Sequence, residues 1–248
     1  DKYPKMDPAV YKAIIDESHQ QGLRVAAHVF YLADAKSLIT DGVDVLAHSI
    51  RDLPVDSALI AMMKSHNVIY IPTLMVDESS FVFAENSAVT QDLFFKQAVS
   101  PELLQQLQSQ QYRDKVEHDP NLAHVKAAFI TGKKNLQTLE DAGVRIAMGT
   151  DSGASPTRIP GWAEHHELEL MVQAGLTPMQ AIVAATSGSA AVLGVSDRGT
   201  LEVGKRADFL VLAANPLDNI SHTRELLSVW HGGNEVQPRV AAPSLRVQ

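Results

Sequence analysis

The sequence predicts an α/β fold with a parallel sheet, followed by a small antiparallel β unit at its C-terminus. Two observations indicate this fold class. Short apolar runs alternate with amphipathic segments up to about residue 195, and strands that alternate with helices form parallel sheets. After residue 195 short β-type runs are separated by Gly-Lys, Asn-Pro and Gly-Gly turns. We therefore divide the chain into residues 1–195 and 196–248.

The first element is a helix that begins at Asp7-Pro8 and ends before Gly22, because Asp caps a helix and Pro fits its first turn. Its apolar residues share one face: Val10, Tyr11, Ile14 and Ile15. Apolar runs of strand length predict four buried strands at residues 24–28, 43–49, 68–74 and 145–150. Helices are expected between the first three strands, at residues 34–40 and 55–64.

Residues 75–143 form a long insertion between the third and fourth strands. Helical patterns occur near residues 91–98, 101–112 and 121–142, and the length far exceeds that of an ordinary connection between a strand and a helix. We expect a helical lid over the strand ends. Further helices are predicted at residues 164–174 and 177–193, and short strands at residues 199–203, 208–212 and 226–230.

Composition excludes several classes of partner. The 248 residues include 21 Lys and Arg against 29 Asp and Glu, which gives a net charge of −8 with no basic run. We therefore expect no nucleic acid partner. No apolar stretch reaches the length of a membrane span, so we expect a soluble segment. The chain has no cysteine, which excludes thiolate ligands but leaves the compartment open between cytoplasm and export.

Three side chains of metal-ligand type end predicted strands. His28 and His48 close the first and second strands, and Asp151 closes the fourth within Gly-Thr-Asp-Ser. Because parallel strands present their C-terminal ends at one edge of a sheet, we expect these side chains to lie close together. Alone, each histidine fits a structural role equally well, and Asp151 fits a helix cap. Together they favour a divalent metal site, with zinc first.

At these residues the chain resembles the amidohydrolase superfamily, specifically its imidazolonepropionase-like and prolidase-like branch. The resemblance rests on the segments HVFYLADAK, GVDVLAHSIRD, YIPTL, MGTDSG, HELELMVQAGLTPMQAIVAATSGSAAVLG and GTLEVGKRADFLVLAANPL. It implies that residues 1–195 are the C-terminal part of a (β/α)8 TIM-type barrel, and that residues 196–248 belong to a small β-sandwich. It also implies one or two divalent ions held by His28, His48 and Asp151, with Asp151 as the catalytic base.

The implied reaction is hydrolysis of a C–N bond by a metal-activated water. The substrate would be a small molecule or short peptide with an amide, peptide or cyclic amide bond, and the activities implied include dipeptidase and carboxypeptidase. The chain departs from the family in lacking a His-x-His pair and an assignable bridging lysine. Its first predicted strand already matches the family's fifth. The alternative is therefore a catalytically incomplete fragment or assembly partner, expected to be a homo-oligomer or to need an N-terminal segment.

Loops after the strand ends offer candidate substrate-binding residues. Tyr31 follows His28, Arg51 follows His48, and His165 opens the helix after Asp151, while His166 is a weaker candidate. The remaining histidines lie outside the shared segments, and we expect them to be exposed: His19, His66, His118, His124, His222 and His231. Ser152 lies in no Gly-x-Ser-x-Gly signature, so serine hydrolysis is disfavoured.

Overall fold

The computed structural model describes residues 4–237 of the chain, and its centre is a four-stranded parallel sheet. The strands lie in the order β1 (Ala26–His28), β2 (Val45–Ala47), β3 (Ile69–Ile71) and β4 (Arg145–Ile146). The predicted α/β class with a parallel sheet is confirmed. Each strand is shorter than the apolar run that predicted it. The residues that follow β2, β3 and β4 leave the ladder to form the loops described below.

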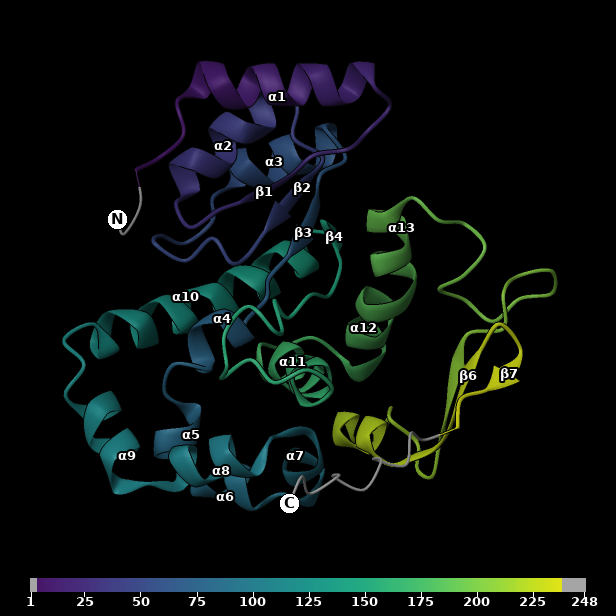
Figure 1. The fold of residues 1–248 in the computed structure, drawn as a ribbon. Helices are drawn as coiled ribbons and strands as arrows, with labels where there is room; N and C mark the ends of the chain where they lie inside the picture. The colour runs from purple at the N-terminus through teal and green to yellow at the C-terminus, as the bar shows by residue number, and fades with distance from the viewer. Residues whose placement is uncertain (1–3, 238–248) are drawn as a thin grey trace, which may run out of the picture.

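Helices α1 (Pro8–Gln20), α2 (Leu32–Thr40) and α3 (Ser57–Ser65) gather at one end of the molecule (Figure 1). Asp7 caps α1 as predicted, since its carboxylate accepts the backbone N–H of Ala9 at 2.8 Å. The predicted apolar face of α1 is only partly buried. Ile15 lies in the core, whereas Val10 and Ile14 are 49% and 44% exposed. No described element covers their side of the helix.

The burial of strand β1 also differs from the prediction. Residues 24–28 were predicted to form a buried strand, but Ala26 and His28 are exposed. The reason is its place in the sheet: among residues 4–237 β1 is an edge strand that pairs only with β2. The core is centred instead on β2 and β3, where Leu46 and Tyr70 are fully buried.

Residues 75–143 are largely helical, and their role as a lid insertion stays a prediction. They contain α4 (Met75–Glu78), α5 (Val82–Glu85), α6 (Ser87–Gln91), α7 (Leu93–Ala98), α8 (Pro101–Gln108), α9 (Gln110–Glu117) and α10 (Leu122–Asp141). Helices α5 to α9 form a group at the end of the molecule opposite α1, and α10 lies across the molecule between this group and helices α1 to α3 (Figure 1). The ring centroids of Phe83 and Phe95 lie 5.5 and 5.2 Å, respectively, from that of Trp162. These contacts join the insertion to α11 (Trp162–Gln173).

The predicted helix at residues 177–193 is continuous but contains a π-helical turn. It comprises α12 (Pro178–Val183), the π-helix η1 (Ala184–Gly188) and α13 (Ser189–Leu193), and ends at Gly194 with φ 67°. A Cβ at Gly188 would lie 2.5 Å from the carbonyl oxygen of Ile146. Glycine is therefore needed where this turn approaches the end of β4.

Within residues 196–237 the C-terminal unit is an antiparallel sheet, and its membership in a β-sandwich stays a prediction. It consists of β5 (Phe209–Leu212), β6 (Leu226–His231) and β7 (Asn234–Glu235), with the 3-10 helix η2 (Ile220–Arg224) before β6. No second sheet occurs within residues 196–237, and residues 238–248 lie outside the described part. The strand predicted at residues 199–203 does not form, because Gly199 has φ 90° and Leu201 and Val203 face outward without a partner strand.

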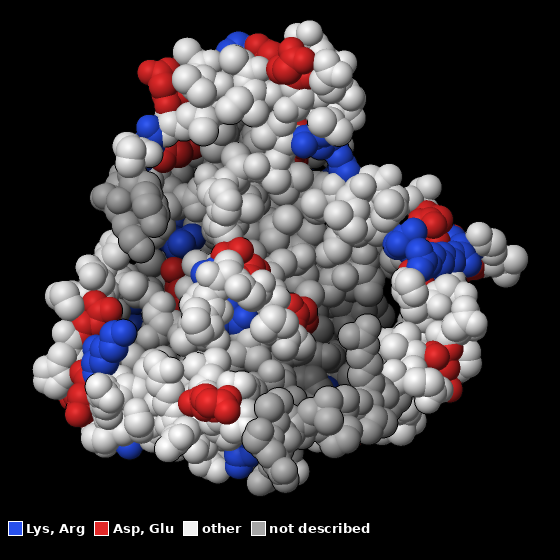
Figure 2. Space-filling view, viewed as in Figure 1, with Lys and Arg blue, Asp and Glu red and all other residues white. Residues whose placement is uncertain are grey.

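Charges of both signs are interspersed on the face shown in Figure 2. Lys and Arg side chains lie beside Asp and Glu, as in the exposed pairs of Lys12 with Asp16 and Lys36 with Asp56. Within residues 4–237, none of the helices combines the length and the hydropathy needed to cross a bilayer.

Candidate active site

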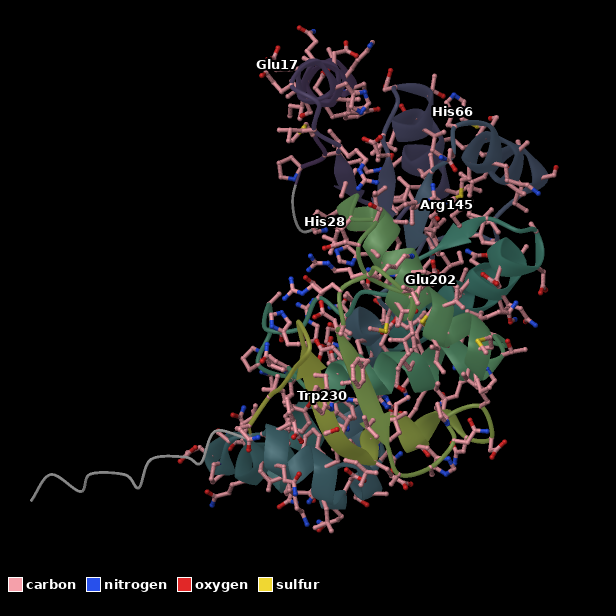
Figure 3. The ribbon with its side chains drawn as sticks, turned by 90° about the vertical axis from the view of Figure 1, so that its right-hand side faces the viewer. Glu17, His28, His66, Arg145, Glu202 and Trp230 are labelled. Carbon is pink, nitrogen blue, oxygen red and sulfur yellow. The ribbon has the colours of Figure 1, made fainter. Side chains whose placement is uncertain are left out.

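The structure brings His28 and His48 together at the C-terminal edge of the parallel sheet. His28 ends β1 in register with Ala47 of β2, and His48 is the next residue along the chain. Nδ1 of His28 lies 2.5 Å from Nε2 of His48, and the ring centroids are 4.6 Å apart. Figure 3 shows His28 toward the middle of the molecule, whereas Glu17 and His66 lie at its upper end. Two imidazole nitrogens therefore converge at one point.

The second nitrogen of His48 is held by a hydroxyl group. Its Nδ1 lies 2.6 Å from Oγ1 of Thr73, which follows β3. Burial and then the adjacent His28 lower the pKa of His48 to about 4, although the negative charge of Asp151 opposes the shift. A neutral imidazole whose Nδ1–H donates to a neighbouring oxygen keeps the lone pair of Nε2 for a cation at neutral pH.

Backbone strain is concentrated at the same sheet edge. His48, Thr73 and Asp151 have φ angles of 74°, 43° and 55°, and they follow β2, β3 and β4. Among residues 4–237 the only other non-glycine residue with positive φ is Asn67. Asn, Asp and His tolerate this region better than other types do, so the β-branched Thr73 is the most unusual of the four. Such conformations cost about 1–3 kcal/mol each and persist where the surroundings impose them, often at functional sites. The backbone after β2, β3 and β4 thus contains a residue in the left-handed region each time.

Asp151 is placed by a loop that closes on itself. Its carboxylate pairs with Nη1 of Arg158, seven residues further on. Glu164 of α11 anchors both ends of the loop, because it accepts Oγ of Ser152 at 2.5 Å and the backbone N–H of Gly161 at 2.7 Å. These bonds, together with one from Thr150, lower the pKa of Glu164 although burial raises it. Glu164 is therefore an ionised anchor for the loop that carries Asp151.

The donor set fits a divalent cation in part. Two imidazoles supply converging nitrogen ligands, and the hydroxyl of Thr73 orients one of them as metal-binding histidines require. The Asp151 carboxylate is directed at Arg158 instead. Among residues 4–237, no three His, Cys, Asp or Glu side chains are grouped so that they could hold a metal ion. The ligand role of His28, His48 and Asp151 therefore stays a prediction.

The three predicted substrate residues lie in different surroundings. Tyr31 packs under Lys5, whose Nζ is 3.9 Å from the ring centroid. The side chain of Arg51 is 10% exposed, with Nε 3.0 Å from a carboxylate oxygen of Asp77 and Nη1 donating to the carbonyl of Ser49. Arg51 is thus already engaged by partners within the fold. Burial raises the pKa of Asp77 to about 6, against the opposing charge of Arg51.

His165 faces the C-terminal unit rather than the histidine pair. Its Nδ1 lies 3.0 Å from Oγ1 of Thr223 in η2, and its ring meets Phe94 edge-on with centroids 5.0 Å apart. Five of the six histidines that were expected to be exposed are exposed. The exception is His222, which is half-buried and whose Nδ1 lies 2.8 Å from the carbonyl oxygen of Asn215.

Nearly all of the described chain matches one family. A model of the amidohydrolase family covers residues 4–236.

The chain belongs to the amidohydrolase family.

Relatives from the predicted branch share this family. An ochratoxinase from Aspergillus niger is 28% identical over 237 residues, which cover 93% of this chain and 42% of that protein. An imidazolonepropionase from Deinococcus deserti is 38% identical over 102 residues, which cover 40% of this chain and 25% of that protein. The resemblance inferred from the sequence is confirmed.

Solved structures agree with the family assignment. A Xaa-Pro dipeptidase with bound methionine in its active site superposes with a TM-score of 0.68 at 26% identity, over 94% of this chain and 50% of that one. A putative prolidase from Bifidobacterium longum gives a TM-score of 0.67 at 30% identity, over 94% and 51%. The amidohydrolase chain thus spans about half the length of these two structures.

Sequence reasoning missed several residues around the site of this amidohydrolase chain. Thr73 lies at the end of a predicted strand, as His48 does, so the same strand-end rule could have found it. Arg158 and Glu164 gave no such signal, because the first lies in a polar loop and the second in the first turn of a helix. Their roles depend on how residues 151–161 fold back on Asp151.

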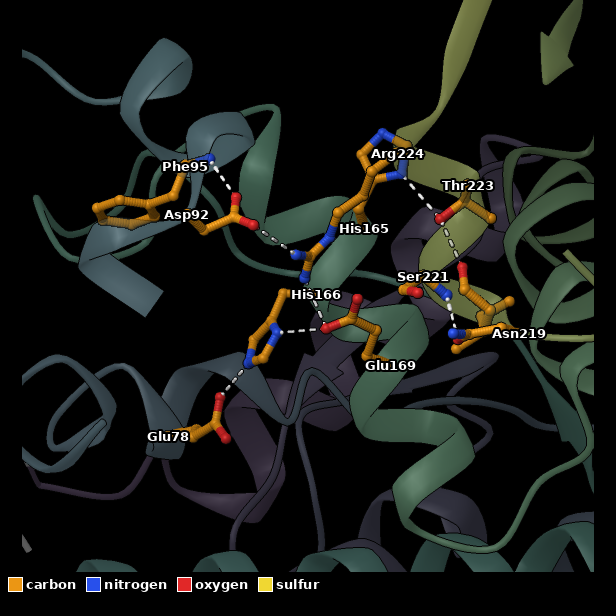
Figure 4. A network of polar contacts seen from close by, with 11 residues as sticks. Glu78, Asp92, Phe95, His165, His166, Glu169, Asn219, Ser221, Thr223 and Arg224 are labelled. Carbon is orange, nitrogen blue, oxygen red and sulfur yellow. Dashed lines mark hydrogen bonds and ion pairs between the residues drawn. The ribbon is translucent and has the colours of Figure 1, made fainter. Parts of the chain in front are cut away.

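His166, the weaker candidate, lies in a buried ionic network. Its Nε2 is 2.6 Å from Glu78 in α4, and its Nδ1 is 3.1 Å from Glu169 in α11. Arg224 of η2 binds Glu169 at 2.6 Å and reaches toward Asp92 at 3.8 Å (Figure 4). The network joins the helical insertion and the C-terminal unit to α11 of the amidohydrolase chain.

This network predicts a pH-dependent stability. Burial opposes the charge on His166, but the hydrogen bonds and charges of Glu169 and Glu78 outweigh it and raise its pKa to about 9. The stabilisation is complete below pH 6.5, the unfolded pKa, and is lost as pH rises through 9. We expect the free energy of unfolding to fall by roughly 3 kcal/mol across this window.

Urea denaturation at pH 6 and pH 9.5 measures the effect. His166→Gln should remove this part of the pH dependence, and His66→Gln, an exposed control, should retain it. Equal pH dependence in the wild type and His166→Gln would contradict the assignment.

Proposed function

We propose that this chain supplies part of the active site of a metal-dependent hydrolase that cleaves a C–N bond, with His28, His48 and Asp151 as metal ligands. One observation carries the proposal: the 2.5 Å approach of two imidazole nitrogens at the sheet edge, in a chain of the amidohydrolase family. The strained backbone at His48 and Asp151 also supports it, since strain of this kind gathers at functional sites.

Each side chain has a defined task in the proposed reaction. His28 and His48 hold the cation, and Thr73 keeps the ring of His48 oriented. When bound, a divalent ion, with zinc the first candidate, would supply Lewis acidity at this site. Asp151 accepts a proton from the water that attacks the carbonyl carbon and returns it to the nitrogen that leaves. The products are a carboxylic acid and an amine.

The proposed substrates are small amides and short peptides. Support comes from the names of similar proteins, an ochratoxinase, a Xaa-Pro dipeptidase and a putative prolidase. The helical insertion packs on α11 through Trp162, and we propose that it forms the lid that limits substrate size.

Hydrolysis with and without metal tests the proposal. A panel of Xaa-Pro dipeptides and N-acyl amino acids is incubated with the protein plus zinc, and release of the free amine is measured. We expect turnover that a chelator abolishes and that added zinc restores. Turnover of the same size in the chelated protein would refute the metal-dependent reaction.

One observation favours the alternative, in which the chain is a fragment or an assembly partner. Strand β1 presents an exposed edge, and α1 exposes Val10 and Ile14. Light scattering separates the two: a catalytically active monomer favours the enzyme, and an inactive obligate oligomer favours the assembly partner.

A further inference from the structure

We propose that Glu167 is a positioning residue of the candidate site, which holds the backbone after β3 so that Thr73 orients the ring of His48. The inference rests on the proposed function and deepens it, because His48 is one of the residues to which that function assigns a task. Glu167 lies within α11, so its position gives no strand-end signal in the sequence.

The carboxyl group of Glu167 binds the segment that follows β3. Its Oε1 accepts the backbone N–H of Leu74 at 2.7 Å, and its Oε2 accepts that of Met75 at 2.8 Å. Leu74, Met75 and Glu167 each have 0% of their surface exposed. Backbone N–H groups in such surroundings need an acceptor, and Glu167 supplies one for both.

A buried acid is an unusual choice for this task. Burial raises the pKa of Glu167 to about 8, whereas the N–H groups of Met75 and Leu74 lower it. Helix starts are normally capped by a neighbouring residue, as in α3, where Asp56 accepts the N–H of Leu59 at 2.8 Å. The start of α4 is held instead by an acid 93 positions away in the chain. The contact therefore fixes this segment against α11.

Thr73 is the residue that requires a fixed backbone. It is β-branched and has a φ of 43°, a region that such residues avoid. In this conformation its Oγ1 lies 2.6 Å from Nδ1 of His48. If the backbone after it were free, Thr73 would return to a negative φ and move its hydroxyl group. Glu167 thus acts on His48 through Thr73.

Two acids of α11 contact strand ends, and a third does not serve this purpose. Glu164, one turn before Glu167, accepts Oγ of Ser152 at 2.5 Å in the loop that carries Asp151. The partners of Glu169 lie in helices, because it binds Arg224 of η2 and His166 of α11. Glu169 therefore offers a control on the same helix.

Nitrogen NMR of the histidine rings at neutral pH tests the inference on the full chain, without added metal or substrate. We expect the proton of wild-type His48 on Nδ1, where it bonds Thr73. In Glu167→Gln an amide nitrogen replaces one acceptor oxygen and cannot accept an N–H. The Nδ1–H signal should therefore weaken, and the signal of the other tautomer should appear. Amide exchange at Leu74 or Met75 should accelerate about tenfold.

Three further variants separate positioning from a general loss of stability. Glu169→Gln removes an acid whose side chain is 17% exposed, and it should leave the His48 signals unchanged. Thr73→Val should reproduce the His48 spectrum of Glu167→Gln, and combining the two should cause no further change. Glu167→Asp shortens the side chain and should cause a smaller change of the same kind, which answers the question if Glu167→Gln does not fold. The absence of the His48 signals in His48→Asn assigns them.

Unchanged His48 signals in the folded Glu167 variant, or the same change in Glu169→Gln, would overturn the inference. A wild-type His48 with its proton on Nε2 would also overturn it. The spectra do not depend on turnover. The expected spectra from a chain that hydrolyses no amide would refute the proposed function alone, and unchanged spectra from a chain that does hydrolyse amides would refute this inference alone.

Discussion

Asp151→Asn is expected to lower kcat for a cleaved amide by about a hundredfold to ten-thousandfold, the usual contribution of a general base. The substitution removes the group that accepts the proton from water, while asparagine tolerates the positive φ of 55° at this position. Initial rates at saturating substrate and zinc measure the effect. Because the fold is retained, the loss should appear in kcat and not in the yield of folded protein.

Asp218→Asn provides the control, since Asp218 is exposed in a turn of the C-terminal unit. It removes the same charge and should leave kcat unchanged. A rate for Asp151→Asn equal to that of the wild type would exclude this carboxylate from the proton transfer.

The second large effect is expected on zinc affinity. His28→Ala and His48→Asn should each weaken zinc binding by more than about a hundredfold, because even loss of a partner of a ligand costs about 10–100-fold. Asparagine is chosen for position 48 because it accepts the φ of 74° there. Competition with a chromophoric chelator gives the dissociation constants.

His66→Ala is the matched control, since this exposed histidine lies at the end of α3, distant from His28 in Figure 3. It should bind zinc as the wild type does. The zinc affinity of Thr73→Val should lie between that of the ligand variants and that of the control, because this change removes only the hydroxyl group that orients His48. If all four variants bind zinc equally, the metal lies elsewhere.

Much of the fold follows from local sequence patterns. Asp7-Pro8 and Gly194 mark helix ends correctly, because capping is decided by neighbouring residues. Burial is different, since it depends on what lies across the surface. The apolar residues near Ala26 resemble a buried strand, yet β1 is an edge strand in the described part of the chain. Leu201 and Val203 likewise have β-type neighbours but no strand to pair with.

The sequence could predict only those residues of the candidate site that lie at the ends of predicted strands. His28 and His48 meet because parallel strands in register place their C-terminal residues together. Arg158 could not be found this way, since its position depends on the hydrogen bonds that fold residues 151–161 back on Asp151. The engagement of Arg51 by Asp77 depends equally on a helix from the insertion.

X-ray absorption at the zinc edge tests most directly whether His28 and His48 share one ion. The protein is loaded with one equivalent of zinc, and the ligand shell of the wild type is compared with that of His28→Ala. We predict at least two imidazole nitrogens at about 2.0–2.1 Å in the wild type and one fewer in the variant. The same number of imidazole ligands in both spectra would contradict the account.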